Sequence, residues 1–290
     1  MPPAAEIGVI VVHGMGTQPE HFANTFIARI DHRLKQHEIP AGTVRWKPVW
    51  WADLVREREE ELWAAVSRDH ELRFAAIRRF FITHFGDALA YQRVPVQRSD
   101  FYRDIHTRVA DRVRDLRAEL GTDRPLVAIG HSLGSVILSN FIWDVQHGND
   151  ERRAVRPETP FERMETLTAI ITVGSSIALF TLRLAEIVAI EFPPRTLPPH
   201  LSRVAQWLNF YDADDVLAYP LRPLSPTYEA AVTEDIAMDA GHPPRSWTPL
   251  SHDAYWTDEE FVARTARLMR DVASAARVTP PGDDDFVPYG

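Results

Sequence analysis

Short apolar runs rich in β-branched residues alternate with helical segments along most of this chain. Strands are predicted at residues 7–12, 43–50, 126–129, 168–173 and 204–211, with a weaker run at 229–238. Helical spacing of apolar residues is found at 20–36, 136–146, 178–190 and 258–276. Strands that alternate with helices form parallel sheets covered on both faces. We therefore expect an α/β fold, a mostly parallel twisted sheet of about six strands with helices on both faces.

A stretch without any strand pattern interrupts this alternation at residues 51–120. Its aromatic residues have helical spacing and lie among many arginines. We expect a helical insertion within a single domain of residues 1–277, followed by a flexible tail at 278–290 that is rich in proline, glycine and aspartate. The insertion either adds packing to the sheet or forms a lid over the site. Its run Arg78–Phe81 also suggests peripheral contact with a membrane surface.

The composition excludes several kinds of function. None of the 290 residues is a cysteine, which excludes disulfides, thiolate zinc sites, iron–sulfur clusters and thiol nucleophiles. A formal net charge of −9 argues against nucleic-acid binding, which usually needs a basic surface. The first residues have no signal-peptide pattern, and Arg183 and Glu186 interrupt the longest apolar stretch, so no membrane-spanning helix is predicted. We expect a cytoplasmic protein without a metal or cofactor.

The most specific motif is the G-x-S-x-G string Gly130-His131-Ser132-Leu133-Gly134. It follows the predicted strand at 126–129 directly and opens a predicted helix, which is the setting of a nucleophile elbow. The serine of an elbow stands on a tight, strained turn, and the flanking glycines let strand and helix approach closely. The start of the helix also favours developing negative charge. The alternative is an ordinary turn serine that caps a helix.

A serine hydroxyl needs a general base to become nucleophilic, and that base needs an orienting acid. The loop after the strand at 204–211 offers Asp212, Asp214 and Asp215 as acids. Their alternative roles are turn hydrogen bonds or a hard cation site, for which no further acids at ligand spacing were found. His252 lies in the loop immediately before the closing helix and is favoured as the base over His242, which lies in a Gly-His-Pro-Pro turn.

An oxyanion hole needs two backbone N–H groups that point at one oxygen atom. The N–H of Leu133, directly after the serine, is expected to be one donor. The other expected donor is Met15, in the loop His13-Gly14-Met15-Gly16 that follows the first predicted strand. The two glycines permit a tight bend that turns the Met15 N–H inward. The alternative is a plain glycine-rich turn.

Four segments resemble the α/β-hydrolase family, and most closely its lipase- and esterase-like bacterial members. They are Val12–Gly16, Gly130–Val136, Asp215–Leu221 and Ser251–Trp256. The resemblance implies a nucleophile at Ser132, a base at His252 and an acid in the loop 212–215. Comparison of residues 215–219 with the family's Asp-Pro-Val-Ala-Tyr-like stretch favours Asp215 as the acid. The chain departs from the family at Val216, where a proline is expected, and it lacks the two N-terminal antiparallel strands.

The resemblance implies cleavage of carboxylic esters through an acyl-enzyme, on a small-molecule ester or lipid-like substrate with an apolar acyl group. The residues expected near the substrate are His13, Gly14, His131, Ser175 and Tyr255. Two alternatives stay open. The first is a thioesterase, amidase or acyltransferase that uses the same triad. The second is a non-catalytic binding protein on a hydrolase scaffold.

Overall fold

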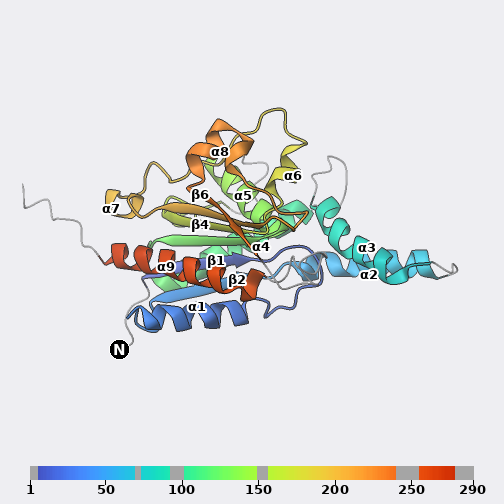
Figure 1. Cartoon of the computed structure of the whole chain (residues 1–290), viewed down its shortest axis with the longest axis horizontal. Helices are drawn as coiled ribbons and strands as arrows, with labels where there is room; N and C mark the ends of the chain where they lie inside the picture. Colours follow the sequence, from blue (N-terminus) through green and yellow to red (C-terminus); the bar gives the residue numbers. More distant parts are fainter. Residues whose placement is uncertain (1–5, 69–72, 92–100, 149–155, 240–254, 278–290) are drawn as a thin grey trace, which may run out of the picture.

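A six-stranded parallel sheet forms the centre of the protein (Figure 1). The computed structural model describes residues 6–68, 73–91, 101–148, 156–239 and 255–277. The strands are β1 (Ile7–Val12), β2 (Val44–Val49), β3 (Leu126–His131), β4 (Leu167–Val173), β5 (Gln206–Asp212) and β6 (Glu234–Met238). Their order is β2-β1-β3-β4-β5-β6, and every neighbouring pair is parallel. The carboxyl ends of all these strands therefore meet at one edge of the sheet.

Helices cover both faces of this sheet (Figure 1). One face carries α4 (Phe101–Leu120), α5 (Leu133–Gln146) and α8 (Pro226–Ala231). The other face carries α1 (Asn24–Gln36) and α9 (Glu259–Ala276). The expected fold class is thus confirmed, because the sheet is parallel and helices lie on both of its sides.

Strand β1 shows how the sequence creates two apolar layers. Successive residues of a strand point to opposite faces. Ile10 and Val12 therefore pack in the layer with α4 and α5, while Val9 and Val11 pack in the layer with α1 and α9. All four side chains are fully buried, as a continuous apolar run in a central parallel strand predicts.

Two expected elements differ from the structure. The helix expected at 178–190 is only the short α6 (Ile177–Thr181). The residues beyond it do not bury an apolar face, since Leu182 is 85% exposed. The strand expected at 229–238 is confined to β6, because a helix occupies its first residues. Ser225 starts that helix, α8, by accepting a hydrogen bond from the Tyr228 N–H. Two further short helices are α7 (Pro199–Ser202) and η1 (Arg222–Leu224).

The segment 51–120 divides into two parts. Its last helix, α4, packs against β1 and β2 and buries its apolar stripe in the core. The preceding helices, α2 (Ala52–Ser67) and α3 (Ala75–Ala90), form a hairpin that extends past the carboxyl edge of the sheet (Figure 1). On α3 the rings of Phe81 and Phe85 stack at 5.0 Å and are about half exposed. None of the described helices is long and apolar enough to cross a bilayer.

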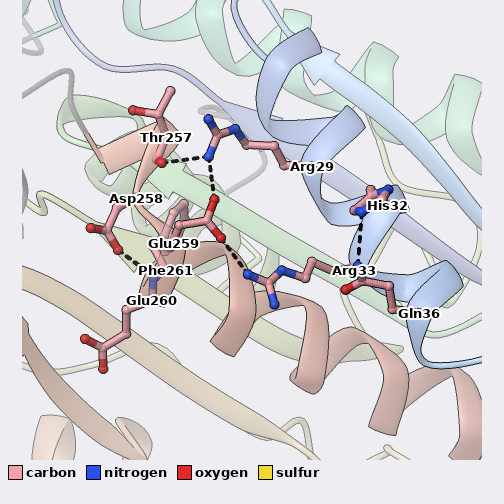
Figure 2. A network of polar contacts seen from close by, with 9 residues as sticks. All are labelled: Arg29, His32, Arg33, Gln36, Thr257, Asp258, Glu259, Glu260 and Phe261. Atoms are coloured by element: carbon pink, nitrogen blue, oxygen red, sulfur yellow. Dashed lines mark hydrogen bonds and ion pairs between the residues drawn. The ribbon is translucent and has the colours of Figure 1, made fainter.

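Polar contacts join α1 to the start of α9 (Figure 2). The Glu259 carboxylate accepts hydrogen bonds from Arg29 at 2.9 Å and from Arg33 at 2.5 Å. Arg29 also donates to the Thr257 carbonyl oxygen at 2.9 Å. Asp258 caps α9 by accepting two backbone N–H bonds of its first turn. Together these contacts hold the start of α9 against α1.

Candidate active site

Ser132 lies between the end of β3 and the first residue of α5. Its backbone has φ 51° and ψ −125°, a conformation that residues with a Cβ rarely adopt and that costs about 1–3 kcal/mol. Ser132 is fully buried, and its Oγ has no hydrogen-bond partner among the described residues. Buried hydroxyl groups are nearly always paired, so a strained serine whose Oγ lacks a partner in the described part of the chain indicates a functional position.

The glycines of the motif explain how the turn fits. A Cβ at Gly134 would lie only 2.3 Å from the carbonyl oxygen of Val12, and one at Gly130 would lie 2.7 Å from Ser135 Cα. Neither neighbour can move, because both atoms belong to backbone. The start of α5 therefore packs directly on the end of β1, and only glycine leaves room for this contact.

Ser175 supports the serine turn from the turn that follows the neighbouring strand β4. Its Oγ forms a 2.8 Å hydrogen bond with the Oγ of Ser135, and Ser135 Oγ donates to the Ser132 carbonyl oxygen at 2.5 Å. The Ser132 N–H donates to the Val173 carbonyl oxygen at 3.0 Å. Ser175, expected near the substrate, is fully buried in this network.

The loop after β1 lies against the serine. A Cβ at Gly14 would come within 2.6 Å of Ser132 Cβ. His13 anchors the loop: its Nδ1–H donates to the Gly14 carbonyl oxygen at 2.8 Å, and its Nε2 accepts from the Trp51 N–H at 3.1 Å. Burial lowers the pKa of His13 to about 3, against the opposing effect of the Gly14 hydrogen bond. His13 is therefore neutral at physiological pH, and both ring nitrogens are engaged.

The two expected oxyanion donors come from segments that adjoin Ser132. Leu133 is the first residue of α5, and the N–H groups of a first helical turn have no acceptor within the helix. Met15 is half-buried and follows Gly14 directly. The structure thus brings both residues next to the serine turn, at the positive end of a helix.

Asp87 of α3 holds the same loop and was not found by sequence reasoning. The Gly16 N–H donates to Asp87 Oδ2 at 2.7 Å, in a buried contact between residues 71 positions apart. Burial raises the pKa of Asp87 to about 8; the Gly16 hydrogen bond lowers it, and the nearby Glu59 carboxyl group raises it further. No pattern in the sequence links α3 to this glycine. The helical hairpin is therefore tied to the loop of the expected oxyanion donor.

The three aspartates after β5 have different surroundings. Asp215 is buried; its Oδ1 accepts from the Leu217 N–H at 3.0 Å and its Oδ2 from the Tyr255 hydroxyl at 2.8 Å. Asp214 is exposed. Asp212 is buried, and its Oδ1 accepts from the Asp214 N–H at 2.8 Å. The environment of Asp215 is that of a carboxylate held in one orientation.

A second group of acids lies beside this loop. The carboxylate oxygens of Asp212, Asp214 and Asp239 lie within 4.8 Å of one another. Asp239 directly follows β6 and was not considered from the sequence. Carboxylate oxygens are ligands for hard cations, but Asp214 and Asp239 are exposed to solvent. The carboxylates of Asp212 and Asp214 therefore lie together, whereas the Asp215 carboxylate accepts a hydrogen bond from the Tyr255 hydroxyl.

Tyr255 connects the acid loop to the chain before α9. Its hydroxyl donates to Asp215 and accepts from the Asp212 N–H at 3.1 Å. Burial, followed by the charge of Asp215, raises the pKa of Tyr255 well above its usual value, so the hydroxyl stays protonated. The His131 ring lies 6.0 Å from the Tyr255 ring and 5.4 Å from the Trp256 ring, centroid to centroid. His131 therefore packs near the two aromatic residues that precede α9.

Ser132 and Asp215 follow strands β3 and β5, and one strand, β4, lies between these two. Two interstrand spacings make about 10 Å. The structure thus brings the expected nucleophile and the expected acid to the same edge. His252, the expected base, lies outside the described residues. It precedes the buried Tyr255 by three positions.

No family model matches this sequence, and no curated protein matches it. A solved structure from Xanthomonas campestris pv. campestris, described as a "putative hydrolase of the alpha/beta superfamily", is 13% identical with a TM-score of 0.42, and the alignment covers 92% of this chain and 98% of that one. A protein of unknown function from Agrobacterium tumefaciens str. C58 is 15% identical with a TM-score of 0.44 and 92% coverage of both chains. Both TM-scores are below 0.5, so neither similarity assigns this chain to a family. The class rests on this chain itself: an α/β protein with a strained, buried serine at the carboxyl edge of a parallel sheet.

Proposed function

We propose that this protein is a serine hydrolase that cleaves carboxylic esters through an acyl-enzyme. The observation that carries the proposal is the state of Ser132. Its φ of 51° and its buried Oγ, which has no hydrogen-bond partner among the described residues, are both unfavourable for stability. A nucleophile at the start of a helix gains from both features, because its hydroxyl is held apart from competing partners and faces a positive helix end.

The proposed reaction has two steps. His252 removes the proton from Ser132 Oγ as that oxygen attacks the ester carbonyl carbon, and the N–H groups of Met15 and Leu133 bind the resulting oxyanion. His252 then gives the proton to the departing alcohol, which leaves an ester on Ser132. In the second step His252 takes a proton from water as the water oxygen attacks the acyl carbon, and it returns that proton to Ser132 Oγ as the carboxylic acid leaves. Asp215 orients the imidazole and stabilises its charged form.

Covalent connection supports His252 as the base. The hydroxyl of Tyr255 is bonded to Asp215, and three residues of fully extended chain span at most about 11 Å. His252 is three positions before Tyr255, so the chain keeps it near the Asp215 loop. His13 is unsuited to this role, because both of its ring nitrogens are engaged and its pKa is lowered to about 3.

The direct test is hydrolysis of p-nitrophenyl butyrate by the wild type and by Ser132→Ala. We expect the variant to lose several orders of magnitude in kcat, since the nucleophile is absent. Ser202→Ala, at an exposed serine of α7, serves as the matched control and should retain full activity. Acyl thioesters and anilides in the same assay separate esterases from thioesterases and amidases. Equal turnover by wild type and Ser132→Ala would exclude the proposal.

The acid is tested by comparing three isosteric variants. Asp215→Asn is expected to lower kcat by about 10⁴-fold, as loss of the orienting carboxylate does in serine hydrolases. Asp214→Asn should have little effect, because that side chain is exposed. If Asp212→Asn causes the large loss and Asp215→Asn does not, the acid is Asp212 instead.

A further inference from the structure

A cavity of about 260 Å³ lies between the helical hairpin and the carboxyl edge of the sheet. Its lining includes Met15, Phe85, Ser176, Leu179, Phe180 and Leu217. These residues come from the loop after β1, from α3, from α6 and the turn before it, and from the loop after β5. None of the five residues expected near the substrate from sequence is among those that line this cavity.

Three walls of the cavity belong to segments that contact the candidate catalytic residues. Met15 follows Gly14, which lies against Ser132. Ser176 follows Ser175, which is hydrogen-bonded to the serine turn through Ser135. Leu217 donates its N–H to Asp215 at 3.0 Å. The segments that hold Ser132 and Asp215 therefore also form three walls of the cavity.

The chemistry of the lining is mainly apolar, with two polar groups. Ser176 is only 2% exposed, and its Oγ has no hydrogen-bond partner in the described part of the chain. Arg183 is exposed at the rim, with its guanidinium carbon 5.6 Å from the centre of the Phe180 ring. Small-molecule pockets typically combine an apolar lining with a few polar groups. An apolar chain fits this cavity better than a sugar or a phosphate.

The volume limits the size of that chain. The cavity of about 260 Å³ is just below the range of about 300–1,000 Å³ typical of pockets for drug-sized ligands, so it has room for only a short chain. The acyl group stays attached to Ser132 through both chemical steps, whereas the alcohol must leave before water attacks. A pocket walled by helices on one side and the sheet edge on the other is therefore suited to the acyl group.

We propose that this cavity binds the acyl chain of the substrate and favours short and medium chains over long ones. This inference rests on the proposed function, because it assumes an acyl-enzyme at Ser132. It goes further by naming the chain length and by assigning α3 of the hairpin to the wall of the pocket. Substrate preference is then set by Phe85 and Ala88 of α3 together with Leu179 of α6.

The test is a series of p-nitrophenyl esters from acetate to hexadecanoate. Each buried methylene group raises kcat/KM about fourfold, so the wild type is expected to peak between butyrate and octanoate and to be at least tenfold slower with hexadecanoate. Ala88→Phe fills the pocket and should lower kcat/KM for octanoate at least tenfold with less than twofold change for acetate. Phe85→Ala enlarges the pocket and should move the peak to longer chains. Ala64→Phe, on the exposed surface of α2, is the matched control and should leave the profile unchanged.

Labelling by a small fluorophosphonate separates this inference from the proposed function. If the folded wild type is not labelled and cleaves no ester, the proposed function fails. If every variant is labelled at the wild-type rate but neither Ala88→Phe nor Phe85→Ala shifts the profile, the pocket assignment is wrong. A parallel series of acetate esters with alcohols of increasing length tests whether the cavity binds the alcohol instead of the acyl chain. A shift in alcohol preference instead of acyl preference would overturn the acyl assignment.

Discussion

At Ser132 two unfavourable features occur in one residue, a left-handed backbone and a buried hydroxyl without a described partner. The surrounding atoms enforce the backbone conformation, because the neighbouring glycines are in contact with backbone of β1 and α5. Local strain of this kind persists only where the rest of the fold holds it in place. The strain can be measured separately from catalysis.

The first prediction compares two inactive variants, Ser132→Gly and Ser132→Ala. Glycine at this position relieves about 1–3 kcal/mol of backbone strain. It also loses more chain entropy on folding than alanine does, which costs about 0.5–1 kcal/mol, so the relief of strain should be the larger effect. We expect Ser132→Gly to unfold with a free energy about 1 kcal/mol higher than Ser132→Ala in urea denaturation. If the alanine variant is the more stable one, the turn is not strained.

Asp87 is the second residue whose chemistry can be measured. Its folded pKa of about 8 lies above the ordinary value of 3.8, so the folded protein binds a proton that the unfolded chain releases. The free energy of unfolding therefore falls as the pH rises from about 4 to about 8. The groups that act on this carboxyl are the Gly16 N–H, the half-buried Glu59 and, through Glu59, the Arg56 guanidinium.

The second prediction is that Asp87→Asn removes this part of the pH dependence. An asparagine keeps an oxygen that accepts from the Gly16 N–H but does not titrate. Thermal unfolding should show that Asp87→Asn is more stable than the wild type, with the smallest difference near pH 4 and the largest near pH 8. Glu59→Gln removes the neighbouring carboxylate and should move the midpoint to lower pH. Parallel wild-type and Asp87→Asn stability curves would show that Asp87 ionises normally.

Among the elements, the α1–α9 contact controls the start of the last helix. Arg29 reaches both the Thr257 carbonyl oxygen and the Glu259 carboxylate (Figure 2). These residues come shortly after Tyr255, whose hydroxyl holds Asp215. Exposed ion pairs add little to global stability, so the effect of this contact is expected to be local.

The third prediction concerns Arg29→Ala. Loss of its two contacts should increase amide hydrogen exchange at residues 257–262, while exchange in α5 stays as in the wild type. Arg45→Ala, a half-buried arginine of β2, is the control for loss of an arginine elsewhere. Unchanged exchange at the start of α9 would mean that helix capping by Asp258 is sufficient there.

Elements with a complete apolar pattern could be predicted from sequence, and others could not. The strands at 7–12 and 168–173 and the last helix agree with the structure within a residue or two, because each buries a full face. The stretch after Thr181 has apolar residues at helical spacing, such as Leu184, Ile187 and Val188, but it leaves Leu182 exposed. Apolar spacing predicts a helix only if another element covers its apolar side, which a sequence does not state.

At the scale of the whole molecule, the parallel sheet explains why distant residues meet. The segments after β1, β3, β4 and β5 all emerge at one edge, so the G-x-S-x-G motif, the His-Gly loop and the aspartate loop could be placed together from sequence. The contact of Asp87 with Gly16 and the cavity beside α3 could not be predicted. They depend on how the hairpin docks on the edge, and no periodic pattern encodes that.

The most direct measurement is the mass of the intact protein after reaction with a fluorophosphonate, followed by peptide mapping. We predict one adduct per chain, on Ser132, with a rate that rises as the pH passes about 6.5, the ordinary pKa of histidine. Ser132→Ala should gain no mass, and His252→Ala should react far more slowly. A folded wild type that gains no adduct, or an adduct that persists in Ser132→Ala, would contradict a nucleophilic role for Ser132.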